Sequence, residues 1–256
     1  MLESFRENKA LLERAILAFI LPGVAGAINA AGFVAVGAYT SHVTGAVARI
    51  GDELAAGHMW LATRSLIFVG SFFFGALLST FLILYSKRRG SPPYWRALLV
   101  QCALVFVFAT VSVGSEHRAH LNSLEMTSLI CVAMGMQNAL VTKLSDAVVR
   151  TTHMTGITTD IGIETARAID HYRHLDDGRA LHHLVLRDPE FRKLRLHLAV
   201  LASFLIGATV GPLLYIFVGH LGMLLPCTVL LLLAAFDGWV GLTAHSLAGH
   251  KSPEIT

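Results

Sequence analysis

Six long apolar runs constrain the fold of this chain more than any other feature of its sequence. A transmembrane helix needs roughly 20 predominantly apolar residues, and runs of about that length recur along most of the chain. The predicted spans are Ala15–Val36, Trp60–Tyr85, Tyr94–Val113, Leu124–Val141, Leu196–Val218 and Leu221–Leu242. The predicted fold class is therefore all-α, a polytopic membrane helix bundle of about six spans.

Composition favours a membrane protein over a soluble one. Apolar residues fill 54% of the 256 positions and charged residues only 14%, with a mean hydropathy of +0.62, whereas a soluble domain carries about a quarter charged residues. No small-residue cleavage site follows the charged segment 1–14, so we expect the first span to be retained. The three cysteines fall within spans and form no disulfide or metal-ligand pattern; they are Cys102, Cys131 and Cys227.

The basic residues predict the orientation. With a cytoplasmic N-terminus, the inside segments hold 17 of the 20 Lys and Arg residues, and only Arg49, Arg64 and Arg118 lie outside. Cytoplasmic loops carry the excess of Lys and Arg, so both termini are expected inside. The net charge of +3 then reflects topology and gives no reason to expect a nucleic-acid partner.

A short polar motif occurs twice, each time after an apolar segment. Residues 40–53 read TSHVTGAVARIGDE, and residues 151–164 read TTHMTGITTDIGIE. Further matches flank the two copies: residues 26–30 (GAINA) with 135–139 (GMQNA), and residues 71–76 (SFFFGA) with 203–208 (SFLIGA). Repeats with polar breaks in apolar segments are typical of secondary transporters built from two related halves.

The order of the spans predicts that the two halves are inverted. Three spans separate the copies, and an odd number places them in opposite directions across the membrane, as a 3+3 inverted-topology repeat. Repeat one covers residues 15–113, and repeat two covers residues 124–242 with a cytoplasmic loop at 170–195. The segments 1–14 and 243–256 are expected to be cytoplasmic.

The Thr-Gly steps are the predicted solute site. A helical stretch follows each step, over 46–56 and 157–169, and about 11 helical residues span roughly 16 Å, half a bilayer. Two half-helix N-termini near the midplane would offer N–H groups and partial positive charge to an anion or a carboxylate. The alternative, which the sequence leaves open, is an ordinary capped helix start at the membrane surface.

Individual polar residues carry more specific hypotheses. The predicted solute-binding residues are Asn29, His42, Thr44, Gly45, Asn138, His153, Thr155 and Gly156. The asparagines either bind solute or link helices, and the histidines either shuttle protons or orient the motif backbone. Arg49 and Asp160 occupy matching positions with opposite charge, so they are expected to pair if both lie at membrane depth. Asp237 is an isolated acid in the last span and a further candidate for coupling.

No signature of a soluble enzyme or metal site accompanies these residues. The loop histidines His171, His174, His182 and His183 lack Cys partners and alternate with Arg, so a solvated loop is favoured over a metal site. Phosphate-binding, nucleophile-elbow, zinc-protease and dinucleotide motifs are absent from the sequence. We expect no cofactor, no metal and no catalytic residue.

The same residues carry a family resemblance. Thr44-Gly45 after a Gly-rich apolar span, the block Met134–Ala139 and the block Arg150–Gly156 resemble the YoaK-type family of bacterial inner-membrane proteins, a family of unknown function. The first family motif commonly continues Thr-Gly-Asn, whereas Ala46 follows Gly45 here. The resemblance spans about Ala15 to Leu242 and implies a bacterial inner-membrane protein with about six spans. It implies no substrate.

Two classes of function remain open at this point. The first is a secondary transporter or channel-like permease for a small, preferentially anionic, solute bound between the Thr-Gly motifs. The second is a non-transporting membrane scaffold or an intramembrane enzyme that uses His and acidic residues. Inverted repeats with polar breaks favour the first. The expected partners are the solute and the lipid bilayer, and the sequence is compatible with a homo-oligomer.

Overall fold

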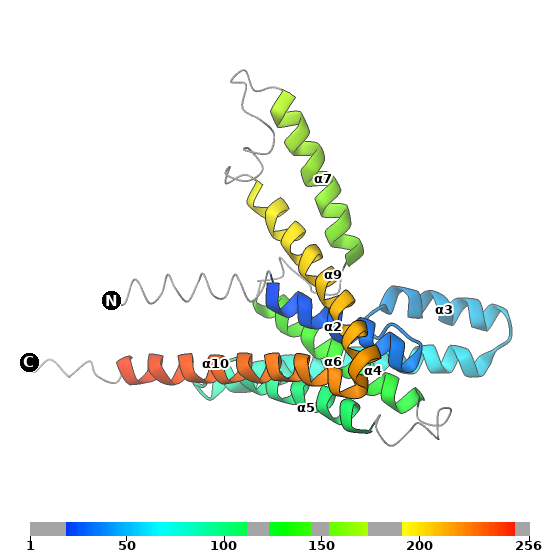
Figure 1. The fold of residues 1–256 in the computed structure, drawn as a ribbon, viewed down its shortest axis with the longest axis horizontal. Helices are drawn as coiled ribbons and strands as arrows, with labels where there is room; N and C mark the ends of the chain where they lie inside the picture. Colours follow the sequence, from blue (N-terminus) through cyan, green and yellow to red (C-terminus); the bar gives the residue numbers. More distant parts are fainter. Residues whose placement is uncertain (1–18, 112–122, 145–153, 174–190, 249–256) are drawn as a thin grey trace, which may run out of the picture.

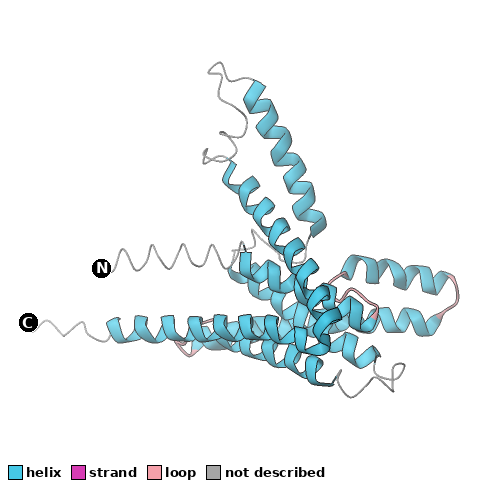
Figure 2. Ribbon diagram, in the orientation of Figure 1, coloured by secondary structure: helices cyan, strands magenta, loops and turns pink. Residues whose placement is uncertain are grey.

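The computed structural model describes residues 19–111, 123–144, 154–173 and 191–248 (Figure 1). Every regular element within these ranges is helical (Figure 2). The elements are α2 (Leu21–Val36), α3 (Val43–Ala55), α4 (Met59–Arg88), α5 (Trp95–Val111), α6 (Ser123–Leu144), α7 (Met154–Arg173), α9 (Arg192–Val218), the 3-10 helix η4 (Gly219–Met223) and α10 (Leu224–Ala248). The all-α class is confirmed.

The predicted spans fall on α2, α4, α5, α6, α9 and α10, and their ends differ by several residues. Met59–Arg88, Leu124–Leu144 and the continuous stretch Arg192–Trp239 are long and apolar enough to cross a membrane, and α2 and α5 are shorter apolar helices. Several long apolar helices therefore suggest a multi-pass membrane protein. The last helix begins later than expected because the chain first makes a turn at Gly219, whose φ is 67°.

The long helices expose large apolar side chains. Phe73 and Phe81 on α4 are 67% and 62% exposed, and Phe217 on α9 is 80% exposed. Large apolar side chains of this kind would be unfavourable in water and are stable in a hydrocarbon environment. The outer faces of α4 and α9 thus support the membrane assignment independently of helix length.

Two helix pairs form the centre of the bundle, α2 with α9 and α4 with α6. Glycines permit backbone contact in both. A side chain on Gly26 of α2 would collide with the backbone of Phe204 in α9, and one on Gly207 of α9 would collide with the backbone of Gly23 in α2. Small residues of this kind allow membrane helices to approach closely.

The α4–α6 pair repeats these contacts. A side chain on Gly135 would meet the backbone of Phe72, and one on Gly75 would meet the backbone of Val132. These glycines are the sequence counterparts of Gly26 and Gly207. The α2–α9 and α6–α4 contacts therefore use glycines at corresponding positions of the sequence repeat.

The third helices of the two halves also meet. Helices α5 and α10 pack together, and the Cys102 thiol donates to the Cys227 carbonyl at 3.3 Å while the Cys227 thiol donates to the Cys102 carbonyl at 3.9 Å. The sequence shows no clear similarity between these two helices. Their reciprocal thiol contacts bring α5 and α10 together at Cys102 and Cys227.

The two motif helices, α3 and α7, lie outside the central pairs, and each forms a hairpin with one helix of those pairs. Helix α3 packs on α4, and α7 packs on α9. Figure 1 shows the two hairpins reaching away from the bundle in different directions, with the turn between α3 and α4 at the right and the far end of α7 at the top. Gly57, with φ 78°, makes the tight turn from α3 into α4, a conformation that side-chain-bearing residues rarely adopt.

Candidate functional site

The first polar motif is fixed to α2 by Asn29. This side chain is 8% exposed, and its Oδ1 accepts the Ser41 backbone N–H at 3.1 Å and the Thr40 hydroxyl at 3.5 Å. A buried amide must be hydrogen-bonded, and these bonds account for the acceptor of Asn29. These bonds link α2 to the segment before α3, and the solute-binding role of Asn29 stays a prediction.

Helix α3 begins earlier than the sequence pattern indicated. Its first residue is Val43, and His42 is the N-cap residue without a side-chain capping bond. Thr44 therefore lies in the first turn, with an exposed side chain, and does not cap the helix. The His42 ring lies over Gly45, because a Cβ on Gly45 would collide with that ring. The space that the missing side chain leaves is filled by His42.

The start of α3 lies beside the central part of α4. A small cavity of about 20 Å³ lies between the start of α3, the middle of α4 and Cys131 of α6. Its lining includes His42, Val43, Phe68 and Phe72. That volume suffices for about one water molecule. Phe68 to Phe72 lie about 14 to 20 Å along a helix of 30 residues, which is about 45 Å long. The N-terminus of α3 therefore meets α4 closer to its middle than to its end.

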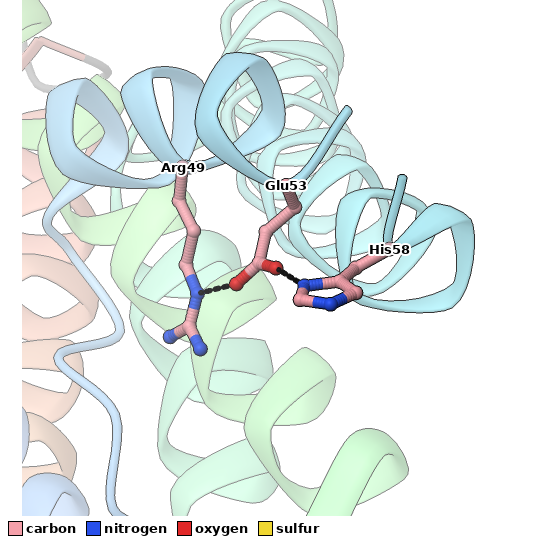
Figure 3. A network of polar contacts seen from close by, with 3 residues as sticks. All are labelled: Arg49, Glu53 and His58. Carbon is pink, nitrogen blue, oxygen red and sulfur yellow. Dashed lines mark hydrogen bonds and ion pairs between the residues drawn. The ribbon is translucent and has the colours of Figure 1, made fainter. Parts of the chain in front are cut away.

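The far end of α3 carries a charged cluster (Figure 3). Glu53, whose side chain is 15% exposed, accepts His58 Nδ1–H at 2.9 Å and Arg49 Nε–H at 3.3 Å. The hydrogen bond from His58, followed by the bond and charge of Arg49, lowers the pKa of the Glu53 carboxyl, so this carboxyl is ionised at neutral pH. The predicted partner of Arg49 was Asp160, but the contact that the structure shows is with Glu53 of its own helix.

The second motif starts helix α7. His153 lies outside the described residues. Thr155 is exposed and its carbonyl accepts the Thr159 hydroxyl at 3.0 Å, whereas Gly156 is half-buried. Met154 and Ile157 pack against the main apolar core. The beginning of α7 thus contacts the bundle, as the beginning of α3 does.

Farther along α7, a charged cleft opens against α9. It has a volume of about 380 Å³ and is lined by Asp160, Ile163, Glu164, Arg167, Lys193 and His197. His197 is 5% exposed, and its Nδ1–H donates to Glu164 Oε2 at 3.2 Å. Each glutamate that ends a copy of the motif, Glu53 and Glu164, is thus half-buried and bonded to a histidine. The signal in the sequence was the recurrence of a Glu at the end of both copies.

Asp237 of α10 contacts the N-terminus of α5. Its Oδ2 accepts the backbone N–H groups of Tyr94 and Trp95, each at 2.9 Å. A carboxylate at a helix N-terminus satisfies free N–H groups and the positive end of the helix dipole. These bonds give Asp237 a capping role for α5, and its predicted coupling role remains a hypothesis.

A buried pair of glutamines is not among the predicted site residues. Gln101 of α5 donates to Gln137 of α6 at 2.7 Å, and Gln137 donates to the Leu21 carbonyl of α2 at 2.7 Å. Both side chains are fully buried, and within the described ranges Gln101 Oε1 has no hydrogen-bond partner. The signal was available, since a Gln inside an apolar span must find partners. Asn138, one residue after Gln137, is half-buried on the same helix.

Comparison with known proteins gives a family but no activity. The family described as protein of unknown function DUF1275 matches residues 17–236. No curated protein matches the chain, and no solved structure matches it.

Proposed function

The chain belongs to the DUF1275 family, and we propose that it is a secondary transporter or channel-like permease for a small anionic solute, built as a 3+3 inverted repeat. The observation that carries this proposal is the reciprocal packing of the two halves. Gly26 lies on Phe204 and Gly135 lies on Phe72. Gly26 is the repeat counterpart of Gly135, and Phe204 is the counterpart of Phe72. An inverted pair of halves around a central axis is the architecture of many secondary transporters.

The depth of the α3 N-terminus supports half-helices over surface helices. Because α3 meets α4 near Phe68 to Phe72, its first turn would lie well inside the hydrocarbon layer if α4 spans the membrane. Irregular backbone at that depth is tolerated only where protein or a cavity surrounds it. The Asn29 bonds to the segment before α3 meet that requirement.

A half-helix start would favour an anion without holding it too tightly. The first N–H groups of a helix are free donors at its positive end, and they carry no full charge. Thr44 and Thr155 add hydroxyl groups in the first turns of α3 and α7, and both side chains are exposed. The solute would therefore be oriented by backbone donors, while the motif histidines adjust their position.

Solute uptake by the purified chain in liposomes tests the proposal. Small inorganic anions and carboxylic acids form the first panel, with protein-free liposomes as the background. The Gly45→Val variant should lose uptake, because the new side chain must displace the His42 ring and rearrange the start of α3. The matched control is Gly51→Val in the same helix, where a Cβ meets open space; it should retain uptake.

Two results would count against the proposal. One is the absence of protein-dependent uptake or exchange for every solute in the panel. The other is equal uptake by the Gly45→Val and Gly51→Val variants once a solute is found, which would remove the start of α3 from the transport path.

A further inference from the structure

A histidine–glutamate contact forms the base of the cleft between α7 and α9. The two helices pack side by side as a hairpin (Figure 1), and the buried His197 holds the largely buried Glu164 at its base. The volume of about 380 Å³ lies at the small end of the range for ligand pockets, which is about 300 to 1,000 Å³. Ile163 supplies an apolar wall beside the charged groups.

Acidic and basic side chains occupy different ends of this cleft. Asp160 and Arg167 lie seven residues apart on α7, about 10 Å along the helix axis, with Glu164 between them on the same face. The helices run antiparallel, because Ala168 packs with Phe191 near the start of α9, whereas the earlier Glu164 bonds to the later His197.

This arrangement gives the cleft a basic end and an acidic end. Lys193, one turn before His197, lies toward Arg167, and Asp160 lies at the opposite end. Within the described part of the chain, Asp160, Arg167 and Lys193 have no ion-pair partner. Glu164 is already engaged with His197. Two cationic side chains at one end and one carboxylate at the other are thus available to a ligand.

We propose that the α7–α9 cleft binds a small zwitterionic solute whose carboxylate and ammonium group lie at opposite ends of a short apolar chain. Arg167 and Lys193 would bind the carboxylate through charge-assisted hydrogen bonds, and Asp160 would bind the ammonium group. Ile163 would contact the methylene groups between them. The binding site stands on the cleft alone. It is separate from the Thr-Gly site of the proposed anionic solute and goes beyond the proposed function.

Ligands with one kind of charge fit this cleft less well. A dicarboxylate would place one carboxylate beside Asp160, and a diamine would place one ammonium group beside Arg167 and Lys193. Like charges brought together at close range are unfavourable, and more so away from bulk water. The cleft therefore selects by the order of the charges and not by net charge.

Three compounds of equal chain length test this selectivity. They are 5-aminopentanoate, pentanedioate and 1,5-diaminopentane, measured by calorimetry against the full purified chain in detergent at low salt, where screening is weak. We expect 5-aminopentanoate to bind about tenfold or more tightly than either of the others. Equal binding of all three, tightest binding of another compound, or no binding at millimolar concentration would overturn the proposal.

Variants locate the site within the hairpin. Lys193→Ala and Asp160→Ala should each weaken 5-aminopentanoate about tenfold, while Arg192→Ala, which removes a neighbouring exposed cation outside the cleft, should leave binding unchanged. Asp160→Lys should shift the preference to pentanedioate. Thermal unfolding shows whether each variant is folded. Binding of 5-aminopentanoate that is unaffected by Lys193→Ala and Asp160→Ala would overturn the site, whereas the transport proposal is tested separately by uptake of anions into liposomes.

Discussion

Gly26 of α2 lies directly against the backbone of Phe204 in α9, in space that one methyl group would overfill. The same relationship recurs between Gly135 and Phe72. Both contacts join the first helix of one half to the second membrane helix of the other. The glycines of the two contacts, Gly26 and Gly135, occupy corresponding positions of the sequence repeat.

Alanine at these two glycines should destabilise the bundle to a similar extent. A Cβ at either position meets backbone atoms that no side-chain rotation can move, so the helices must separate, and overpacking typically costs about 1–3 kcal/mol. We expect Gly26→Ala and Gly135→Ala each to lower the thermal unfolding temperature in detergent by several degrees.

A matched control lies on α4. A Cβ on Gly70 meets open space, and alanine favours a helix over glycine by about 1 kcal/mol, so Gly70→Ala should be neutral or stabilising. If Gly26→Ala and Gly135→Ala unfold at the temperature of Gly70→Ala, the close backbone contact does not exist.

The buried glutamine pair should show strong energetic coupling. Gln137→Leu leaves the Gln101 amide and the Leu21 carbonyl without their partners, and each unsatisfied buried group costs about 1–3 kcal/mol. The double variant Gln101→Leu, Gln137→Leu removes one of those orphaned groups. It should therefore be more stable than Gln137→Leu alone in chemical unfolding. Additive losses from the two single changes would contradict the bonded pair.

Removal of the Asp237 carboxylate should destabilise the N-terminus of α5. Asp237→Ala leaves the N–H groups of Tyr94 and Trp95 without this acceptor, and loss of a helix cap costs about 0.5–2 kcal/mol. Asp237→Asn keeps an acceptor oxygen without the charge and should lose less. Hydrogen exchange at the start of α5 measures the effect directly. Unchanged exchange in Asp237→Ala would rule out the capping role.

The positions of the apolar helices were predictable, because length and apolar character depend on local sequence alone. The predicted span Trp60–Tyr85 falls inside α4 for this reason. The contacts of Asp237 and of Glu164 were not predictable. The partners of Asp237 lie more than 140 residues away, and His197 lies 33 residues beyond Glu164. The local sequence around one residue does not specify a contact with a residue so far away in the chain.

The motif itself was recognised, but the roles of its residues were only partly predictable. Duplication singled out Gly45 as a predicted solute-binding residue. The structure shows the His42 ring over that position, a contact that the sequence did not predict. A ring that folds back over a glycine three residues later depends on its side-chain rotamer, which the sequence does not specify.

Accessibility of the two hairpin ends tests the inverted repeat most directly. The turn after α3 and the end of α7 should lie on opposite sides of the membrane if the halves are inverted. Cysteine at Ala56 avoids the neighbouring positive-φ residue Gly57, where a side chain would strain the turn, and Arg173 is the last residue of α7. With the chain in intact cells, a membrane-impermeant thiol reagent should modify Ala56→Cys and reach Arg173→Cys only after the membrane is opened. Labelling of both positions from the same side would contradict the inverted repeat and the transporter built on it.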